Sequence, residues 1–257
     1  MSTARRGPLF ERLAPLTSVW QEVNDYRVSA RLHTRLAERT PWLCDHTHLA
    51  RIGFKGRGAA AWLQAQGVAL PAAPNHWLRD ASGATVARLG AEDFLITDEH
   101  DTTSGLPQSL AERWHAGSAP GGYPVPHQHG LAAFALGGEG ATELLTRLCA
   151  VDLRPRVFAI DAIAQTQVAL SSAVIMRSTA DAAASYRLFV DTSLALYLWD
   201  ILNDVAVTLG GGALGVAQQP GARAQYLFGH QSPLGFFPAS RSSIGRASRT
   251  DPRPLGP

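Results

Sequence analysis

Lysine, cysteine and long apolar runs are scarce in this sequence of 257 residues. Lys55 is the only lysine among 23 basic residues, which indicates a bias in nucleotide composition rather than a selected nucleic-acid surface. The two cysteines, Cys44 and Cys149, lie far apart and follow no apolar leader, so we expect a protein of the reducing cytoplasm and not a secreted disulfide scaffold. No apolar run approaches the roughly 18 to 20 residues of a membrane-spanning helix, so we expect no membrane segment.

The positive charge of the chain is concentrated at high residue numbers. The net charge is +2 and the pI is about 8.7. From position 217 onward there are five arginines and one acid, Asp251, so this part carries +4 and the remainder carries −2. A slightly acidic body lacks the electrostatic footprint of a nucleic-acid-binding protein. We therefore expect no nucleic-acid partner.

A short pattern of small residues and leucine occurs twice. Two glycines, an alanine and a leucine recur at one spacing, without a gap: Gly56, Gly58, Ala59 and Leu63, then Gly138, Gly140, Ala141 and Leu145. Each copy reads as a strand, a Gly-x-Gly turn and a helix, which predicts one supersecondary unit used twice. The turn favours a folding device, because glycine reaches backbone angles closed to other residues. The alternative is a phosphate cradle on the amides of the helix N-terminus, but the Rossmann and P-loop patterns are incomplete.

Hydrophobic periodicity divides the chain into an N-terminal arm (1–40), a body (41–216) and a tail (217–257). With 46% hydrophobic residues the body can bury a sizeable core. We expect a helix at 29–37 in the arm, and in the body two halves, 41–100 and 131–216, joined by a linker at 101–130. Expected strands are 51–55, 84–89, 94–97, 132–136, 165–170, 172–177 and 185–191, and expected helices are 58–66, 110–114, 139–149 and 193–209. The tail is rich in Ser, Pro, Gly, Gln and Arg, so we expect it to be disordered.

Two segments resemble aminomethyltransferases, the folate-dependent T-protein of glycine cleavage. Residues 45–59 read Asp-His-Thr-His-Leu-Ala-Arg-Ile-Gly-Phe-Lys-Gly-Arg-Gly-Ala, similar to that family's Asp-x-Ser-His opening, strand and Gly-x-x-Ala helix start. Residues 134–141 read Phe-Ala-Leu-Gly-Gly-Glu-Gly-Ala, similar to its second strand and Gly-Pro-x-Ala helix start.

The smaller sarcosine oxidase gamma subunit is a still better match. Its Val-Asp-Leu run, its Ala-Gln-Thr-x-Val strand and its Ser-x-Ala-x-x-Leu-Trp-x-x-Leu helix resemble residues 151–153, 164–168 and 193–202. The resemblance spans about 41–216, and the order and spacing of the motifs make it specific. It implies an α+β fold with two pseudo-repeated halves, each an antiparallel sheet with helices, and without a C-terminal jelly-roll domain.

The gamma-subunit resemblance implies an accessory, structural subunit of a complex that demethylates sarcosine oxidatively and passes the one-carbon unit to tetrahydrofolate. Flavin is then expected only in the partner subunits of this hetero-oligomer. Aminomethyltransferases carry a pair of aspartates after the first hairpin region, whereas residues 80–88 here contain only Asp80. We therefore expect a component of an oxidase rather than an independent catalyst. The alternatives are a reduced aminomethyltransferase that binds tetrahydrofolate on its own, and a free-standing folate sensor.

Candidate site residues are few. Asp45 and His48 occupy the family's Asp-x-x-His positions, so the resemblance implies a cofactor-binding role toward a pterin, against a capping or turn role. A zinc site can be imagined from one cysteine and two His-x-His pairs: Cys44, His46, His48, His127 and His129. Their spacing matches no known finger, so we predict no metal site. We predict no catalytic residue either, because no nucleophile or paired-carboxylate arrangement stands out.

Overall fold

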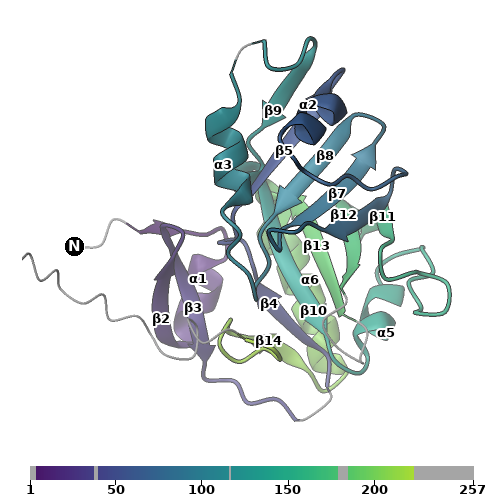
Figure 1. Cartoon of the computed structure of the whole chain (residues 1–257). Coiled ribbons are helices and arrows are strands. Elements are labelled where there is room, and N and C mark those ends of the chain that lie inside the picture. The colour runs from purple at the N-terminus through teal and green to yellow at the C-terminus, as the bar shows by residue number, and fades with distance from the viewer. Residues whose placement is uncertain (1–3, 38–39, 116, 179–184, 223–257) are drawn as a thin grey trace, which may run out of the picture.

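The structure is a computed structural model that describes residues 4–37, 40–115, 117–178 and 185–222. These residues form three β-sheets with helices around them, so the α+β class is confirmed (Figure 1). We name the sheets A (three strands), B (six strands) and C (five strands). In the described part of the chain, no helix is long and apolar enough to cross a membrane.

Sheet C is antiparallel and has the strand order β6-β7-β8-β5-β9. Its strands are β5 (Arg51–Gly56), β6 (His76–Arg79), β7 (Thr85–Gly90), β8 (Asp93–Thr97) and β9 (Gly122–Val125). The strand predicted at 51–55 and the hairpin predicted at 84–97 are confirmed. Strand β9 lies inside the predicted linker, and Pro124 is tolerated there because β9 is an edge strand.

Sheet B has the strand order β11-β12-β13-β10-β4-β14. Its strands are β4 (Trp42–Asp45), β10 (Leu131–Gly137), β11 (Ile163–Val168), β12 (Ser171–Ser178), β13 (Ser185–Asp191) and β14 (Gly212–Leu214). Strands β4 and β14 pair in parallel, so the expectation of purely antiparallel sheets is wrong at this edge. Strand β4 precedes β5 in the chain but joins sheet B, because its buried Leu43 and Cys44 lie opposite Leu136 and Ala135 of β10.

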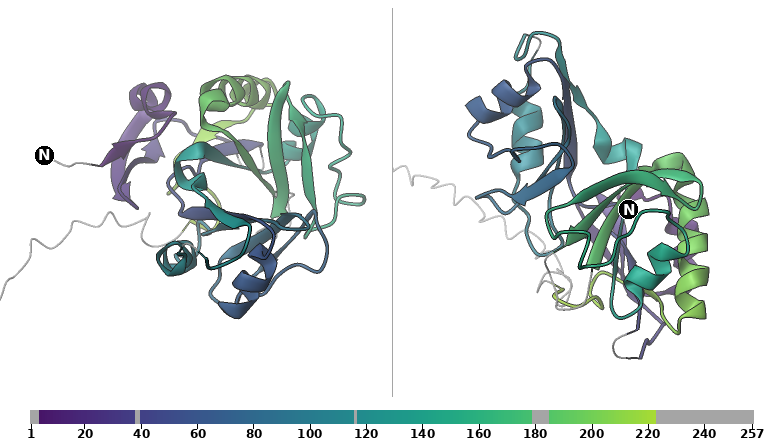
Figure 2. Two further views of the ribbon diagram at one scale, coloured as in Figure 1. Left: turned by 90° about the horizontal axis from the view of Figure 1, so that it is seen from above. Right: turned by 90° about the vertical axis from the view of Figure 1, so that its right-hand side faces the viewer.

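Sheets B and C pack face to face through one apolar layer, with helices on their outer faces (Figure 2). The layer is built from both sheets: Trp77, Ala87 and Leu95 from C, and Ala133, Ile163, Met176 and Phe189 from B. The outer face of C is covered by α2 (Ala59–Ala65) and α3 (Leu106–Arg113). That of B is covered by α5 (Ala141–Thr146) and by α6 (Ala195–Thr208), which follows η2 (Thr192–Leu194). A further short helix, α4 (His127–Gly130), links β9 to β10.

Helix α6 confirms the strongest helical pattern in the sequence. Its Leu198 and Leu202 are fully buried against sheet B, and Gly210 follows its end with φ +79°. The start differs from expectation: a short 3-10 helix, η2 (Thr192–Leu194), precedes α6, and the side chain of Asp191 caps η2 by accepting from the backbone N–H of Ser193 at 2.8 Å. Helix periodicity therefore located α6, whereas the capping residue is Asp191, two residues before the predicted Ser193.

The two Gly-x-Gly turns share one backbone conformation. The φ angles are +95° and +88° at Gly56 and Gly58, and +88° and +90° at Gly138 and Gly140. A Cβ at Gly138 would lie 2.1 Å from the carbonyl oxygen of Thr40, so both the positive φ and the close approach require glycine. This geometry favours the interpretation of the turns as folding devices.

The helix predicted at 29–37 is wrong. The N-terminal segment forms β1 (Arg5–Arg6), α1 (Phe10–Leu13), η1 (Ala14–Leu16), β2 (Thr17–Val23) and β3 (Tyr26–Leu32), and its strands make sheet A in the order β1-β3-β2. Along β3 the apolar residues Tyr26, Val28, Ala30 and Leu32 are buried and alternate with polar ones; Arg27 and Arg31 are exposed, and Ser29 between them is buried. That period of two belongs to a half-buried strand, and its apolar side packs on Cys44 and Val216.

The beginning of the predicted disordered tail is packed on sheet A. The backbone N–H of Ala217 donates to the carbonyl of Ala30 at 2.9 Å, and Ala217 is buried. The carboxamide oxygen of Gln218 accepts from the N–H of Leu32 at 2.7 Å. The prediction of disorder is therefore wrong for 217–222. The rest of that prediction, 223–257, lies outside the described residues.

Candidate functional site

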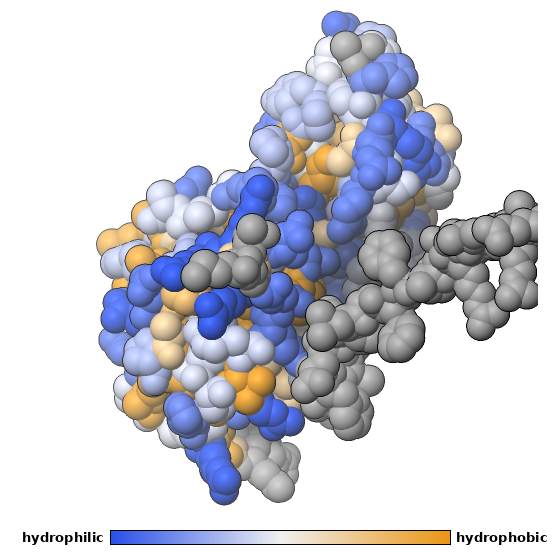
Figure 3. Space-filling model, turned by 90° about the vertical axis from the view of Figure 1, so that its left-hand side faces the viewer, coloured by the Kyte–Doolittle hydropathy of each residue, from blue (hydrophilic) through white to orange (hydrophobic). Residues whose placement is uncertain are grey.

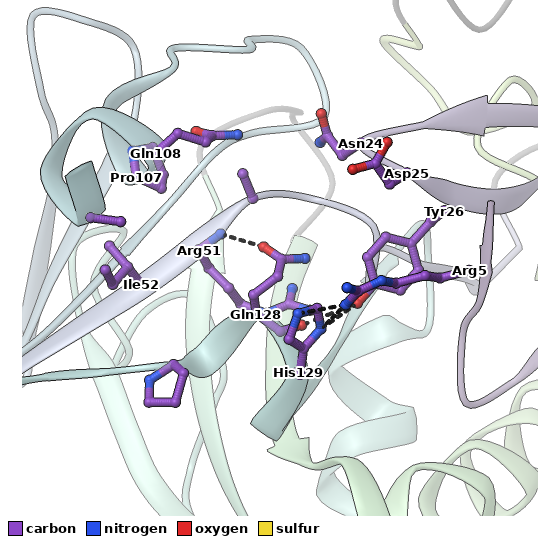
Figure 4. Close-up of a pocket in the computed structure, with 13 residues that line it drawn as sticks. Arg5, Asn24, Asp25, Tyr26, Arg51, Ile52, Pro107, Gln108, Gln128 and His129 are labelled. Atoms are coloured by element: carbon purple, nitrogen blue, oxygen red, sulfur yellow. Dashed lines mark hydrogen bonds between the residues drawn. The ribbon is translucent and has the colours of Figure 1, made fainter. Parts of the chain in front are cut away.

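A pocket of about 500 Å³ lies where sheet A, the start of β5, α3 and α4 meet (Figure 4). Each element contributes polar or apolar lining: Arg5 and Tyr26 from sheet A, Arg51 and Ile52 from β5, Pro107 and Gln108 from α3, and Gln128 and His129 from α4. On the face shown in Figure 3, the molecule narrows between a lower body and an upper lobe, with apolar side chains exposed at the narrowing. The pocket volume is in the range of small-molecule sites.

Arg51 lines this pocket although it is only 3% exposed. Its Nε donates to the carbonyl of His127 at 3.1 Å, and its Nη2 donates to the carbonyls of Thr47 and Leu131 at 2.7 and 3.0 Å. Burial lowers the pKa of Arg51 to about 10, so the guanidinium stays charged at neutral pH. The pocket therefore contains a cation held in place by backbone carbonyls.

Gln128 lies directly beside Arg51. The backbone N–H of Arg51 donates to Oε1 of Gln128 at 2.9 Å, which orients the carboxamide (Figure 4). Among the described residues, neither Nε2 of Gln128 nor Nη1 of Arg51 has a hydrogen-bond partner, and both atoms are buried. Two adjacent residues of the pocket thus each carry a donor without an acceptor.

His129 joins the pocket to sheet A. Its Nε2 lies 2.7 Å from Nη1 of Arg5, and its Nδ1 lies 3.0 Å from the hydroxyl of Tyr26. Burial, with smaller contributions from Arg5 and Arg51, lowers the pKa of His129. The imidazole is therefore neutral at neutral pH, and it accepts from the Arg5 guanidinium.

Asp45, the last residue of β4, and His48, in the turn that follows it, are the two predicted cofactor-binding residues. The carboxylate of Asp45 accepts from the N–H of Thr47 at 2.9 Å, and burial raises the pKa of Asp45 against this hydrogen bond. The carbonyl of His48 accepts from Nδ2 of Asn24 at 3.0 Å, and burial lowers the pKa of the His48 side chain to about 3. Neither side chain is among the described residues that line the pocket. The Asp45 carboxylate stabilises the turn between β4 and β5.

Asp80 also has a local structural role. It lies in the turn between β6 and β7, where its carboxylate accepts from the N–H of Ser82 at 2.8 Å. Hydrogen bonds from Ser82 and from the backbone of Ala69 lower its pKa even though burial opposes them. Asp80 does not line the pocket described above.

A second polar group of residues lies at the junction of sheets B and C. The rings of His46 and His100 stack with their centroids 5.6 Å apart, and Nε2 of His46 lies 2.8 Å from Oε1 of Gln219. Arg187 forms an ion pair with Glu99 beside them. The cavity that these residues enclose has a volume of about 20 Å³, enough for one water molecule and too small for a pterin.

The structure does not assemble the imagined zinc ligands. The rings of His46 and His48 are edge to face with centroids 6.2 Å apart, whereas His129 contacts Arg5 elsewhere. Cys44 packs in an apolar cluster, and burial raises its pKa well above the usual value. In the described residues, no group of three or more His, Cys, Asp or Glu side chains could hold a metal ion.

Sequence reasoning missed Arg51 and Gln128, the two central residues of the pocket. A signal for Arg51 was present, since an arginine beside the apolar strand residues Ile52 and Phe54 falls on a buried strand. Gln128 gave no signal, because it lies in a polar stretch that was predicted to be a linker.

No family model matches the chain. Among curated proteins it is 30% identical, over 145 residues, to the sarcosine oxidase subunit gamma of Corynebacterium sp. (strain U-96), and the match covers 55% of this chain and 68% of that protein. The chain belongs to the sarcosine oxidase gamma subunit family.

Solved structures agree with this gamma-family fold. A chain of the heterotetrameric sarcosine oxidase from Corynebacterium sp. U-96 is 24% identical, with a TM-score of 0.61 over 80% of this chain and 96% of that chain. The glycine cleavage system aminomethyltransferase T from Bartonella henselae is 15% identical, with a TM-score of 0.63 over 83% of this chain and 60% of that one. At these identities the structural matches establish the aminomethyltransferase-like fold alone.

Proposed function

We propose that this gamma-family chain is an accessory, structural subunit of a sarcosine-oxidase-like complex. In that complex flavin is held by partner subunits, and oxidative demethylation is linked to tetrahydrofolate in one-carbon metabolism. The observation that carries the proposal is the 30% identity to a curated gamma subunit across 68% of its length. A cytoplasmic location is part of the proposal, and both cysteines being free supports it.

An exposed apolar surface supports the presence of partner subunits. Helix α6 and the turn before it expose four large apolar side chains, Leu194, Leu196, Tyr197 and Val207, at 37 to 58%. Leu170 is 85% exposed in the β11–β12 turn, whose carbonyl at Ala169 accepts from the Tyr197 hydroxyl at 3.0 Å. Apolar surfaces of this kind mark sites of protein association. We name Leu170, Leu194, Leu196, Tyr197 and Val207 the α6 surface.

The fold proposal is one aminomethyltransferase-like domain, 41–216, made of two pseudo-repeated halves. The matching φ angles of the two Gly-x-Gly turns support a repeated unit. The halves interlock in space, since β4 belongs to the first half and lies in sheet B with the strands of the second half. Their limits in the sequence, 41–100 and 131–216, therefore describe repeats of the chain rather than separate bodies.

The test is to purify the native complex through an internal tag and to measure its mass and its absorbance spectrum. We expect a large assembly with a flavin spectrum. Leu196 and Val207 lie eleven residues apart and so share one face of α6. Replacing both with aspartate should therefore release the partners, whereas Gln64→Asp on the exposed side of α2 should not. A colourless particle of one or two chains contradicts the proposal.

The second candidate function is tetrahydrofolate binding by the chain itself, through Asp45 and His48. Its support is that both residues are held at the junction where β4 leaves sheet B and β5 enters sheet C. The 20 Å³ cavity beside His46 weighs against a pterin at that junction. Titration of the isolated chain with tetrahydrofolate tests this function: saturable binding that Asp45→Asn and His48→Asn abolish would favour it over the accessory role.

A further inference from the structure

The guanidinium of Arg51 is a buried charge without a paired anion. In the described part of the chain, no carboxylate lies within 4.0 Å of it, unlike the buried Arg187, which has Glu99 at 2.6 Å. Backbone carbonyls satisfy Nε and Nη2, and Nη1 is left without an acceptor. A buried cation of this kind is costly unless an anion compensates it.

Asp45 does not compensate this charge by contact. It influences Arg51 electrostatically, but its carboxylate is engaged by the N–H of Thr47 at 2.9 Å. Asp45 is also absent from the pocket lining, whereas Arg51 is part of it. The position for a compensating anion is therefore on the pocket side of Arg51.

Gln128 supplies a second donor from the lining of the same pocket. Its Oε1 is occupied by the N–H of Arg51, so its Nε2 is the end of the carboxamide that remains to be satisfied. A carboxylate has two oxygens and accepts from two donors at once, and such charge-assisted hydrogen bonds are the strong ones. The pair of donors fits a carboxylate better than a single-atom anion.

The rest of the pocket determines the body of the ligand. Several lining residues are apolar: Ala50, Ile52, Pro107, Ala111 and Pro126. Two arginines and one acid, Asp25, line the pocket, so its net charge favours an anion. A volume of about 500 Å³ holds an apolar group of ring size or larger beside the carboxylate.

We propose that this pocket binds an organic carboxylate: Arg51 and Gln128 donate to the carboxylate oxygens, and the apolar wall holds the body of the ligand. This binding site goes beyond the accessory role. It is also distinct from the folate alternative, whose residues Asp45 and His48 lie outside the lining.

Benzoate, benzamide and acetate are the probes. Benzoate has the charge and the apolar ring, benzamide is a neutral molecule of the same shape, and acetate has the charge without the ring. Isothermal titration of the full chain should give saturable binding of benzoate. Benzamide and acetate should each bind at least about tenfold more weakly, because benzamide lacks the charge for a charge-assisted hydrogen bond and acetate lacks the buried ring. No binding of benzoate, or equal binding of benzamide, overturns the proposal.

Gln128→Glu tests the position of the ligand. The variant is isosteric, retains an acceptor for the N–H of Arg51, and replaces the Nε2 donor with a fixed negative charge beside the position of the ligand's carboxylate. We expect benzoate binding to be lost and the melting temperature of the ligand-free chain to rise, because Arg51 gains its anion. Gln64→Glu adds the same charge on the exposed side of α2 and should change neither quantity. Benzoate binding that persists in Gln128→Glu overturns the assignment to Arg51 and Gln128.

Discussion

Arg187 and Glu99 form a buried ion pair that connects sheets B and C. Nη1 of Arg187, on β13, lies 2.6 Å from Oε1 of Glu99, which follows β8, and the two side chains are 7% and 11% exposed. The hydroxyl of Thr85 hydrogen-bonds to both partners, and the Arg187 guanidinium lies 5.4 Å from the ring centroid of Trp77. The two sheets are thus joined by charge at the edge of an apolar layer.

We predict that Glu99→Gln lowers the free energy of unfolding by about 3 kcal/mol, because it leaves Arg187 buried without its counterion. Urea denaturation measures the change. The double variant Glu99→Gln with Arg187→Met should be more stable than Glu99→Gln alone, since the orphaned charge is then gone. Glu143→Gln breaks the exposed pair with Arg147 and should cost no more than about 0.5 kcal/mol. An effect of Glu99→Gln as small as this control would mean that Arg187 is solvated.

The histidines at the sheet junction should make the protein lose stability in mild acid. Burial lowers the pKa of His46 well below its usual value and that of His48 to about 3. Below about pH 6.5, the pKa of histidine in the unfolded chain, the unfolded chain binds protons that the native state does not bind. The free energy of unfolding therefore falls by up to about 1.4 kcal/mol for each pH unit and each histidine. The raised pKa of Asp45 acts in the opposite direction, because a protonated carboxyl favours the native state.

His48→Asn isolates one of these titrations. Between pH 6 and pH 4, the slope of unfolding free energy against pH should be smaller than in the parent chain by about 1.4 kcal/mol per pH unit, which corresponds to one proton. This comparison does not depend on the absolute stability of the variant. An unchanged slope would show that His48 is accessible to protons in the native state.

The segment after β14 should be part of the folded unit. The carboxamide of Gln218 accepts from the N–H groups of Leu32 and Gly215 at 2.7 and 2.9 Å, and it donates to the carbonyls of Leu32 and Thr34 at 3.2 and 3.3 Å. We predict that Gln218→Leu costs about 2 to 3 kcal/mol, because it leaves backbone groups unpaired. Gln64→Leu, on the exposed side of α2, should stay within about 0.5 kcal/mol. An equal loss of unfolding free energy in the two variants would show that this segment has no structural role.

Gly138→Ala should destabilise the protein by more than about 2 kcal/mol, because its Cβ would collide with the carbonyl of Thr40 in addition to the strain of a positive φ. Gly67→Ala is the matched control: φ is +81° there, but nothing lies within 4 Å of the added Cβ. The control should show only the conformational strain, about 1 kcal/mol. Thermal unfolding of both variants separates the collision from the strain.

Local patterns predicted the elements that depend on one face of burial. The spacing of Leu198 and Leu202 identified α6, and the alternation around Ile52 and Phe54 identified β5. The helix expected at 29–37 was wrong, because helical propensity was considered without the alternation of apolar and polar residues along β3. That alternation suits pairing in sheet A. Strand β9 was missed because a four-residue edge strand with a proline carries almost no pattern.

The sequence by itself determined the family, through motifs in a fixed order, and the family resemblance implied the α+β class. It also determined the Gly-x-Gly turns, since these depend on residues that are neighbours along the chain. Tertiary structure alone decided that β4 joins sheet B, that Arg187 meets Glu99, and that Arg51 and Gln128 share a pocket with Arg5. The physical reason is that these pairings are set by which buried faces meet. The burial of Arg51 can be read from its strand, but the lack of a counterion among the described residues around it is recognisable only from the tertiary structure.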